Sequence, residues 1–567
     1  MKDQFTLRLC RSVSDVGPYS MPENSMTGAS ALSGDPLSFK AVYRFSGDGK
    51  QTVLPVALKI EGDISPDAFK VYKVGNVPVI NPVANNTDPS LYTATSPSLC
   101  PDPLYLRTPG TEIEFDTYRN RYYEEGQRVT LNATQAPQTL WIELDTAGTG
   151  AGEYRADVVF VDLTDGSEAA RESITLKVVS PVCDAGIPTC TNWFYCDTIA
   201  DLYGVETFSP RHFEIIENYV KVAAEHGMDM ILVPAFTPPL DTRIGKERRT
   251  VQLVRVRVKD GKYSFDFSDF EKFVRICQKC GIEYFEHSHL FTQWGAEHAP
   301  KIVAEVDGEE KRIFGWETDA GSDEYAFFLT QYLTALRAEL EKLGISDKIF
   351  FHVSDEPKEE HLDAYRRGRD LIKSVLPEAR TFDAMSSYDY YESGSVDIPV
   401  VREISPDIDR FAASCPEFWL YYTGGKIYEG NSNRLITLPT SRNRQLGLHM
   451  YLCGATGFLH WGYNYYYDVL SHGVCDPLSD PCFYLGSPGS PYLVYPSPDG
   501  KAIPSLRLKV MREAFSDYRA LRALEKKIGR ENVMKLVETE LGQVGVRTAV
   551  EGDALVDFTE KIIDMLA

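Results

Sequence analysis

Two adjacent acidic residues are the strongest candidates for chemistry in this sequence. Asp355 and Glu356 follow the short apolar segment 348–353 and directly precede Pro357. Neighbouring carboxylates repel each other, which raises the pKa of one and keeps the other ionised. One protonated acid beside one anion is the combination that cleavage of a glycosidic bond requires. The sequence therefore predicts Asp355 and Glu356 as a catalytic pair.

The same dipeptide also has a structural interpretation. Proline is suited to the first turn of a helix, so a helix is expected to begin at Pro357. Acidic residues are favoured at helix starts, where Asp355 would cap the helix and Glu356 would lie in its first turn. Position alone does not decide between capping and catalysis.

A metal site is a second alternative. His287 and His289 flank Ser288 in an extended segment, which places both imidazoles on one side as a potential ligand pair. No third histidine or carboxylate completes a recognised spacing. The eleven cysteines show no repeating framework and are interpreted as structural thiols. Neither a metal nor another cofactor is predicted.

Length and patterning predict the elements that must position these residues. A chain of 567 residues, 43% hydrophobic and 25% charged, predicts two or three globular domains. Segments such as Gln138–Leu144 and Tyr154–Asp162 alternate apolar and polar residues between frequent turns. This pattern predicts an N-terminal β-sandwich domain over residues 1–180.

Strand and helix patterns alternate from about residue 190. Helices are expected over 210–226, 269–280 and 323–343, and strands over 192–197, 228–234, 282–287, 348–353, 380–384, 398–402, 417–422 and 457–461. The α/β alternation predicts a (β/α)8 TIM-like barrel over 190–530, followed by a C-terminal helical tail over 531–567. Active sites of such barrels lie where strands end, which is where Asp355 and Glu356 fall.

Charge and hydropathy exclude several classes of partner. The formal net charge of −23 disfavours nucleic acid and anionic membranes. No stretch of about 18 apolar residues predicts a membrane span, and the first residues lack the apolar core of a signal peptide. Together with cysteines interpreted as structural thiols, this predicts a cytoplasmic protein. The carboxylate pair predicts a small-molecule or oligosaccharide substrate, and the oligomeric state is left open.

Several motifs, in order, resemble one known family. They are FHVSDEP (351–357), DAMSSYDYYESG (383–394), the segments 438–467 and 489–525, and the upstream runs 288–302 and 312–318. Together they are similar to the domain-of-unknown-function family 4091, which belongs with glycoside hydrolase family 123, the β-N-acetylgalactosaminidases. The resemblance covers roughly residues 190–530 and implies a β-sandwich followed by a (β/α)8 barrel.

The resemblance implies a retaining mechanism in which the substrate assists. The 2-acetamido oxygen of a β-linked N-acetylhexosamine would attack C1 and form an oxazolinium ion. Glu356 would protonate the leaving oxygen and later activate water, while Asp355 would hold the acetamido N–H. N-acetylgalactosamine is favoured by this family analogy, although the sequence does not distinguish it from the gluco epimer.

Further substrate-binding candidates follow from placement near strand ends. Tyr388 is expected to hydrogen-bond the acetamido carbonyl, and Trp461 to form an aromatic wall with Tyr463 and Asn464 beside it. The remaining candidates are in the loop after the third strand, on the seventh strand and in a helical segment: His289, Gln293, Trp294, Trp419, Tyr421 and Arg444. The alternatives are a glycosidase of the same family acting on another sugar, or a carbohydrate-binding protein without catalysis.

Overall fold

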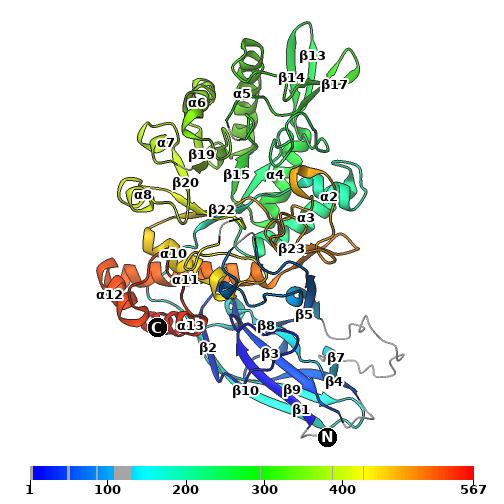
Figure 1. Cartoon of the computed structure of the whole chain (residues 1–567), viewed down its shortest axis with the longest axis vertical. Helices are drawn as coiled ribbons and strands as arrows, with labels where there is room; N and C mark the ends of the chain where they lie inside the picture. Colours follow the sequence, from blue (N-terminus) through cyan, green and yellow to red (C-terminus); the bar gives the residue numbers. More distant parts are fainter. Residues whose placement is uncertain are drawn as a thin grey trace.

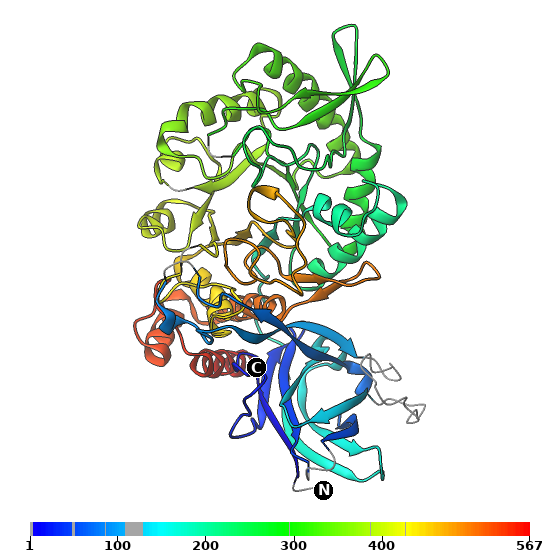
Figure 2. The ribbon, with the colours of Figure 1, turned by 45° about the vertical axis from the view of Figure 1, so that its right-hand side comes forward.

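The computed structural model describes residues 4–47, 52–84, 87–107, 129–293, 295–385, 387–425 and 427–567. Its N-terminal strands lie at one end of an elongated molecule, and an eight-stranded sheet with its helices forms the other end (Figure 1). The last helices of the chain lie between the two (Figure 2). Within the described part of the chain, no helix combines the length and apolar character that crossing a bilayer requires.

Two five-stranded sheets are built from the N-terminal third. The first has the order β1 (Phe5–Arg11), β3 (Leu37–Phe45), β8 (Gln138–Leu144), β5 (Phe69–Val79) and β6 (Ser98–Arg107). The second has the order β2 (Gly28–Leu32), β10 (Glu168–Val179), β9 (Gly152–Asp162), β4 (Val53–Gly62) and β7 (Val129–Thr134). Both sheets contribute to one buried cluster, in which the rings of Tyr43 and Phe160 lie 4.7 Å apart.

The larger unit is an α/β structure around a nearly closed, parallel, eight-stranded sheet. Its order is β11 (Thr189–Asn192), β22 (Gly457–His460), β21 (Trp419–Tyr421), β20 (Ile398–Arg402), β19 (Arg380–Met385), β18 (Ile349–Phe351), β15 (Tyr284–His287) and β12 (Met230–Val233). The expected strands are thus present. Only the first is displaced, because residues 193–195 leave the sheet and α2 (Cys196–Leu202) begins directly after them.

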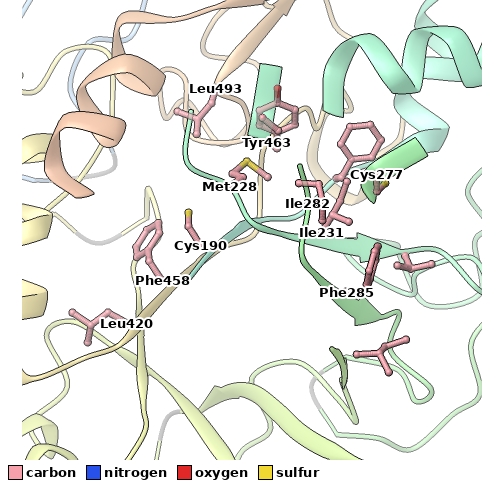
Figure 3. Packing of buried hydrophobic residues seen from close by; sticks show 14 of the residues in the cluster. Cys190, Met228, Ile231, Cys277, Ile282, Phe285, Leu420, Phe458, Tyr463 and Leu493 are labelled. Carbon is pink, nitrogen blue, oxygen red and sulfur yellow. The ribbon is translucent and has the colours of Figure 1, made fainter. Parts of the chain in front are cut away.

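Alternating side chains of each strand separate two cores. In β12, Met230 and Leu232 belong to the cluster inside the sheet, whereas Ile231 and Val233 pack outward. Successive side chains of a strand point to opposite faces, which produces this division. Figure 3 shows part of the outer cluster, where strand residues such as Phe285 and Phe458 pack with Cys277 and Tyr463.

The helices cover this outer face. They are α3 (Pro210–Glu225), α4 (Ser268–Cys280), α5 (Asp323–Leu343), α6 (Leu362–Val375), α7 (Asp389–Glu392), α8 (Ile408–Ser414), α9 (Ser441–Arg444) and α10 (Leu446–Cys453). Capping fixes α5 at both ends: the Ser322 hydroxyl accepts from the amide of Tyr325, and Gly344 adopts a left-handed conformation with φ of 67°. The bounds expected for α5 are those observed.

Smaller elements complete the fold. A four-stranded sheet contains β13 (Arg255–Lys259), β14 (Lys262–Asp266), β16 (Ile302–Val306) and β17 (Glu309–Phe314), and a hairpin joins β23 (Val494–Pro496) to β24 (Ala502–Pro504). The remaining short helices are α1 (Thr146–Thr149) and the 3-10 turns Pro66–Ala68, Pro89–Leu91, Glu359–His361 and Val469–Ser471.

Three C-terminal helices join the two units. They are α11 (Leu506–Ile528), α12 (Arg530–Leu541) and α13 (Gly552–Leu566). Arg507 at the start of α11 forms a buried ion pair with Asp102 of β6, with 2.9 Å between Nη2 and Oδ2. Lys177 of β10 pairs with Asp564 of α13. Charged contacts therefore link the C-terminal helices to both N-terminal sheets.

Candidate active site

The Asp355–Glu356 pair lies at the carboxyl end of β18, on the wall of a cavity of about 220 Å³. The helix expected at Pro357 is wrong, because a 3-10 turn begins at Glu359 and α6 only at Leu362. Neither helix is capped by Asp355 or Glu356. Both acidic side chains are half-buried and line the cavity instead.

The two carboxylates have different surroundings. Burial, then the charges of Glu356 and Asp383, raise the pKa of Asp355 well above its usual range. Glu356 accepts a hydrogen bond of 2.7 Å from the phenol of Tyr421, on β21. One member of the pair therefore favours its protonated form, while the other is oriented by a neutral donor.

The backbone at Glu356 is strained. Its φ of 41° lies in the left-handed region, which non-glycine residues rarely adopt. Such conformations persist only where the surrounding structure enforces them, and they are concentrated at active sites. The strained turn brings the side chain of Glu356 to the cavity beside that of Asp355.

A buried ionic network lies behind the pair. His352 donates through Nε2 to Glu286, at 2.9 Å, and through Nδ1 to Asp383, at 2.8 Å. Asp383 also accepts from the amide of Val353 and the phenol of Tyr365. Burial lowers the pKa of His352, but its two carboxylate partners outweigh this effect and raise the pKa to about 9. An imidazolium thus compensates two carboxylates that are inaccessible to solvent.

Aromatic side chains form the other walls of the cavity. The rings of Trp461 and Tyr484 lie 4.7 Å apart, and Trp193 and Tyr195 contribute from the segment after β11. Trp193 also donates its indole N–H to Glu286, at 3.0 Å. Aromatic faces beside carboxylates suit a sugar, which presents apolar C–H faces and polar hydroxyl groups.

The structure brings five of the twelve expected site residues to this cavity. They are Asp355, Glu356, Gln293, Tyr421 and Trp461. His289 lies behind the wall, stacked on His352 with 4.2 Å between ring centres. Trp294 lies outside the described residues.

The other expected residues have structural contacts. Tyr388 packs on Phe411 and under the guanidinium of Arg410. Tyr463 donates to the carbonyl of Tyr219 in the outer core, and Trp419 is buried against Phe382 inside the sheet. The side-chain amide of Asn464 bonds the backbone N–H and C=O of Tyr195. Arg444 is held by Asp517 and Glu513 in a different cleft, beside the N-terminal strands.

The geometry does not favour a metal site at the histidines. Both ring nitrogens of His287 are engaged, with the carbonyl of Ser288 and the phenol of Tyr332. His289, His352 and Asp383 have potential ligand atoms within 4.8 Å of one another. However, both nitrogens of His352 already bond carboxylates, and its ring is parallel to that of His289, with 8° between their planes. In-plane lone pairs of stacked rings do not converge on one ion.

Sequence reasoning missed several residues of the site. Trp193 and Tyr195 fall in a segment predicted as a strand, and no sequence pattern marks Asp241 or Tyr484, although all four line the cavity. The alternation of Trp193 and Tyr195 directly after a buried strand was the available signal for a wall. Asp241 and Tyr484 belong to long loops, in which no periodicity marks the direction of a side chain.

Comparison with known proteins gives a family and a fold. The model of the glycoside hydrolase 123 catalytic domain matches residues 193–524. A family 123 glycoside hydrolase from Clostridium perfringens has a similar structure, with a TM-score of 0.74 at 16% identity over 99% of this chain and 98% of its own. A family 5 mannosidase from Rhizomucor miehei, with a TM-score of 0.31 and 11% identity, covers 60% of this chain and 95% of its own.

No curated protein sequence matches the chain. The family match nevertheless spans more than half of its length and contains the strand-end carboxylates, the Tyr421 donor and the aromatic walls. This chain belongs to glycoside hydrolase family 123.

Proposed function

We propose that this chain is a retaining glycosidase that releases terminal β-linked N-acetylhexosamine, with N-acetylgalactosamine favoured. The observation that carries the proposal is the placement of Asp355 and Glu356 on one cavity wall, at the end of β18. Retaining enzymes with a carboxylate nucleophile place two carboxyl groups on opposite sides of the scissile bond, about 5–5.5 Å apart. Two acids adjacent in sequence instead suit a substrate that supplies its own nucleophile.

The proposed reaction has two displacements at C1. In the first, the acetamido oxygen forms a bond to C1 while the bond from C1 to the leaving oxygen breaks, and Glu356 gives its proton to that oxygen. In the second, water attacks C1 of the oxazolinium ion, Glu356 takes the proton of the water, and the acetamide is restored. Two inversions leave the β configuration unchanged.

Asp355 would control the acetamido group. Burial and the neighbouring negative charges raise the pKa of Asp355, so in the free enzyme it favours the protonated form. An acetamido N–H donated to Asp355 would favour its anion, because a hydrogen bond to the charged form stabilises that form. The released proton is then available to Glu356, which the hydrogen bond from Tyr421 orients.

The cavity supports a single sugar ring as the bound group. Its volume of about 220 Å³ is below the roughly 300–1,000 Å³ of sites for drug-sized ligands. Trp461 and Tyr484 would cover the apolar face of the ring. The similar Clostridium perfringens enzyme was studied for glycolipid glycan hydrolysis, and we include glycolipid glycans among the natural substrates to be tested.

A comparison of aryl glycosides tests the proposal. The β-N-acetylgalactosaminide should be hydrolysed. The rate on the β-N-acetylglucosaminide, which differs only in configuration at C4, measures the preference for the galacto epimer. The β-galactoside should be resistant because it lacks the acetamido nucleophile. Hydrolysis of the β-galactoside at an equal rate would exclude assisted catalysis. A thiazoline analogue of the oxazoline should inhibit competitively. Binding of N-acetylgalactosamine without any hydrolysis would instead favour a carbohydrate-binding protein.

We also propose the division of the chain and its location. A β-sandwich over residues 1–180, a (β/α)8 catalytic barrel over 190–530 and a helical tail over 531–567 agree with the two facing sheets and the parallel eight-stranded sheet. The eleven free cysteines support a reducing compartment such as the cytoplasm. Separate expression of residues 1–180, and fractionation of cells, would test these two points.

A further inference from the structure

Asp241 adds a third carboxylate to the wall of the same cavity. It lies in the long loop that follows β12, it is half-buried, and it lines the cavity together with Asp355 and Glu356. Its φ of 41° is in the left-handed region, where aspartate and asparagine are enriched among non-glycine residues. The loop conformation therefore presents this side chain at a defined position.

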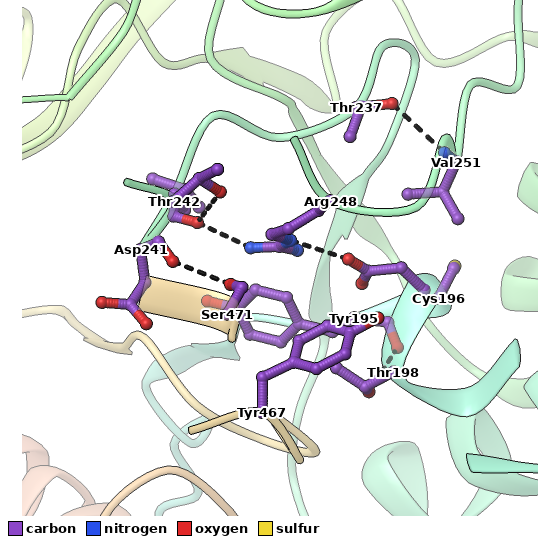
Figure 4. Close-up of polar contacts among 12 residues, drawn as sticks. Tyr195, Cys196, Thr198, Thr237, Asp241, Thr242, Arg248, Val251, Tyr467 and Ser471 are labelled. Carbon is purple, nitrogen blue, oxygen red and sulfur yellow. Dashed lines mark hydrogen bonds and ion pairs between the residues drawn. The ribbon is translucent and has the colours of Figure 1, made fainter. Parts of the chain in front are cut away.

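Four donors hold the residue in place. One carboxylate oxygen, Oδ1, accepts from the phenol of Tyr484, at 2.9 Å. The other, Oδ2, accepts from the phenol of Tyr465 and from the amide of Leu470. The hydroxyl of Ser471 donates to the backbone carbonyl of Asp241, at 2.8 Å (Figure 4). Each carboxylate oxygen has about two lone-pair sites, so Oδ1 retains capacity for one further donor.

A buried arginine anchors the loop segment next to Asp241. The guanidinium of Arg248 donates to Asp197, at 2.7 Å, and to the carbonyl of Leu240, at 2.6 Å (Figure 4). It also lies over the ring of Tyr195, which lines the cavity. Arg248 thus holds the backbone of Leu240, the residue before Asp241, at the cavity wall. The charge of Arg248 is paired with Asp197, so it does not neutralise Asp241.

The ionisable side chains in the described lining of the cavity are acidic, with no lysine, arginine or histidine among them. Among the described residues, Asp241 belongs to no ion pair, and none of the residues lining the cavity is a lysine, arginine or histidine. Every donor to the Asp241 carboxylate is a neutral phenol or amide. The described lining therefore contains three acidic side chains and no basic one.

We propose that Asp241 accepts a hydrogen bond from a hydroxyl of the bound sugar and thereby selects uncharged sugars over sugars that carry a sulfate or carboxylate group. A hydroxyl can donate to the remaining site on Oδ1, whereas an anionic substituent has no proton to donate. An anionic group would also meet the Asp241 carboxylate in a cavity with low dielectric, where repulsion between like charges is strong and no basic side chain of the described lining offsets it. This inference rests on the proposed function, because it concerns the sugar bound at the same site.

The test compares Asp241→Asn with the wild-type enzyme on two substrates. One is the aryl β-N-acetylgalactosaminide, and the other is its 6-O-sulfate ester. Asparagine keeps the shape and tolerates the left-handed backbone, so the variant is expected to fold. Asp347→Asn is the matched control, because it removes the same charge from an exposed site before β18, away from the cavity.

The wild type should hydrolyse the neutral glycoside with a higher kcat/KM than the sulfate ester. Asp241→Asn should lower kcat/KM for the neutral substrate by about 10- to 100-fold, the usual effect of losing a hydrogen bond to a charged group. Asp241→Asn should also reduce the ratio of kcat/KM for the neutral glycoside to kcat/KM for the sulfate ester. Asp347→Asn should change neither kcat/KM nor this ratio. An unchanged kcat/KM and an unchanged ratio in a folded Asp241→Asn variant would overturn the proposal.

A second variant separates charge from positioning. Tyr484→Phe removes a donor to Asp241 but keeps the charge of Asp241, so it should weaken hydrolysis of the neutral glycoside and retain discrimination against the sulfate. If Tyr484→Phe lost the preference for the neutral glycoside over the sulfate ester while Asp241→Asn kept it, the charge of Asp241 would have no role in this preference. Failure of this inference is distinguishable from failure of the proposed function, which would show as an inactive wild type on every acetamido sugar.

Discussion

The phenol of Tyr421 donates a 2.7 Å hydrogen bond to the carboxylate of Glu356, and both residues line the cavity. Burial, and then the charge of Glu356, raise the pKa of Tyr421 well above its usual range. Tyr421 therefore remains protonated over the pH range in which glycosidases work, and it is a constant donor. The end of β21 in this way fixes the orientation of an acid that belongs to the turn after β18.

Tyr421→Phe should lower kcat by about 10-fold or more, because Glu356 loses the group that aims it at the leaving oxygen. The KM should change little, since Phe keeps the ring against the sugar. Steady-state kinetics on the aryl β-N-acetylgalactosaminide measure both constants. A Tyr421→Phe enzyme with unchanged kcat would show that Glu356 is positioned by other contacts.

Asp355→Asn should abolish most activity and yet stabilise the fold at neutral pH. The pKa of Asp355 is raised on folding, so the folded protein binds a proton more tightly than the unfolded chain, and stability falls as pH rises above the unfolded value of about 3.9. Asparagine removes this cost. The gain in Tm over wild type should be larger at pH 7 than at pH 4. An equal gain at both pH values would contradict the raised pKa.

His352→Gln should change how stability depends on pH. The pKa of His352 is raised from 6.5 to about 9 in the folded protein. Its contribution is therefore fully present below about pH 6.5 and is lost as pH rises through about 9, a difference of about 3 kcal/mol. Unfolding of the wild type by urea at pH 6.5 and at pH 9.5 should show this loss.

The His352→Gln variant should be less stable at pH 6.5 and should lack that loss, because Glu286 and Asp383 no longer have a cation between them. A wild-type protein whose stability is flat between pH 6.5 and 9.5 would show that His352 is neutral when folded.

Arg444→Met should reduce stability without altering the site. Arg444 bonds Asp517, at 2.8 Å, and Glu513, at 3.2 Å, and removing one partner of a buried ionic group costs about 3–5 kcal/mol. The Tm should fall, while kcat and KM measured below the transition stay at wild-type values. A raised KM with an unchanged Tm would restore the expectation that Arg444 contacts the substrate.

Regular elements with strong patterns could be predicted from the sequence. The bounds of α5 and β20 are those expected. The apolar residues of α5 repeat with the period of a helix, which Ser322 and Gly344 cap, and β20 is a short buried run rich in β-branched residues. Asp355 and Glu356 could be placed at the cavity because a strand end fixes where its next residues lie. Trp461 and Tyr421 were found by the same reasoning.

The remaining site depends on contacts between distant segments. Asp241 and Tyr484 meet through a hydrogen bond across 243 positions of sequence, and no local pattern encodes such a pairing. Tyr388 and Tyr463 also follow strands, but their rings turn into packing against Phe411 and Phe194 instead of toward the cavity. The helix expected at Pro357 is absent because the chain is still extended at Lys358, with ψ of 166°, and α6 begins only at Leu362.

Turnover by Glu356→Gln is the most direct measurement of the central claim, that Glu356 transfers the proton to the leaving oxygen. The variant should hydrolyse an aryl β-N-acetylgalactosaminide about 10²–10⁴-fold more slowly than wild type, with an unchanged Tm. Glu359→Gln, which removes the same charge at an exposed position three residues later, should be fully active. A Glu356→Gln enzyme with near wild-type kcat would contradict the account.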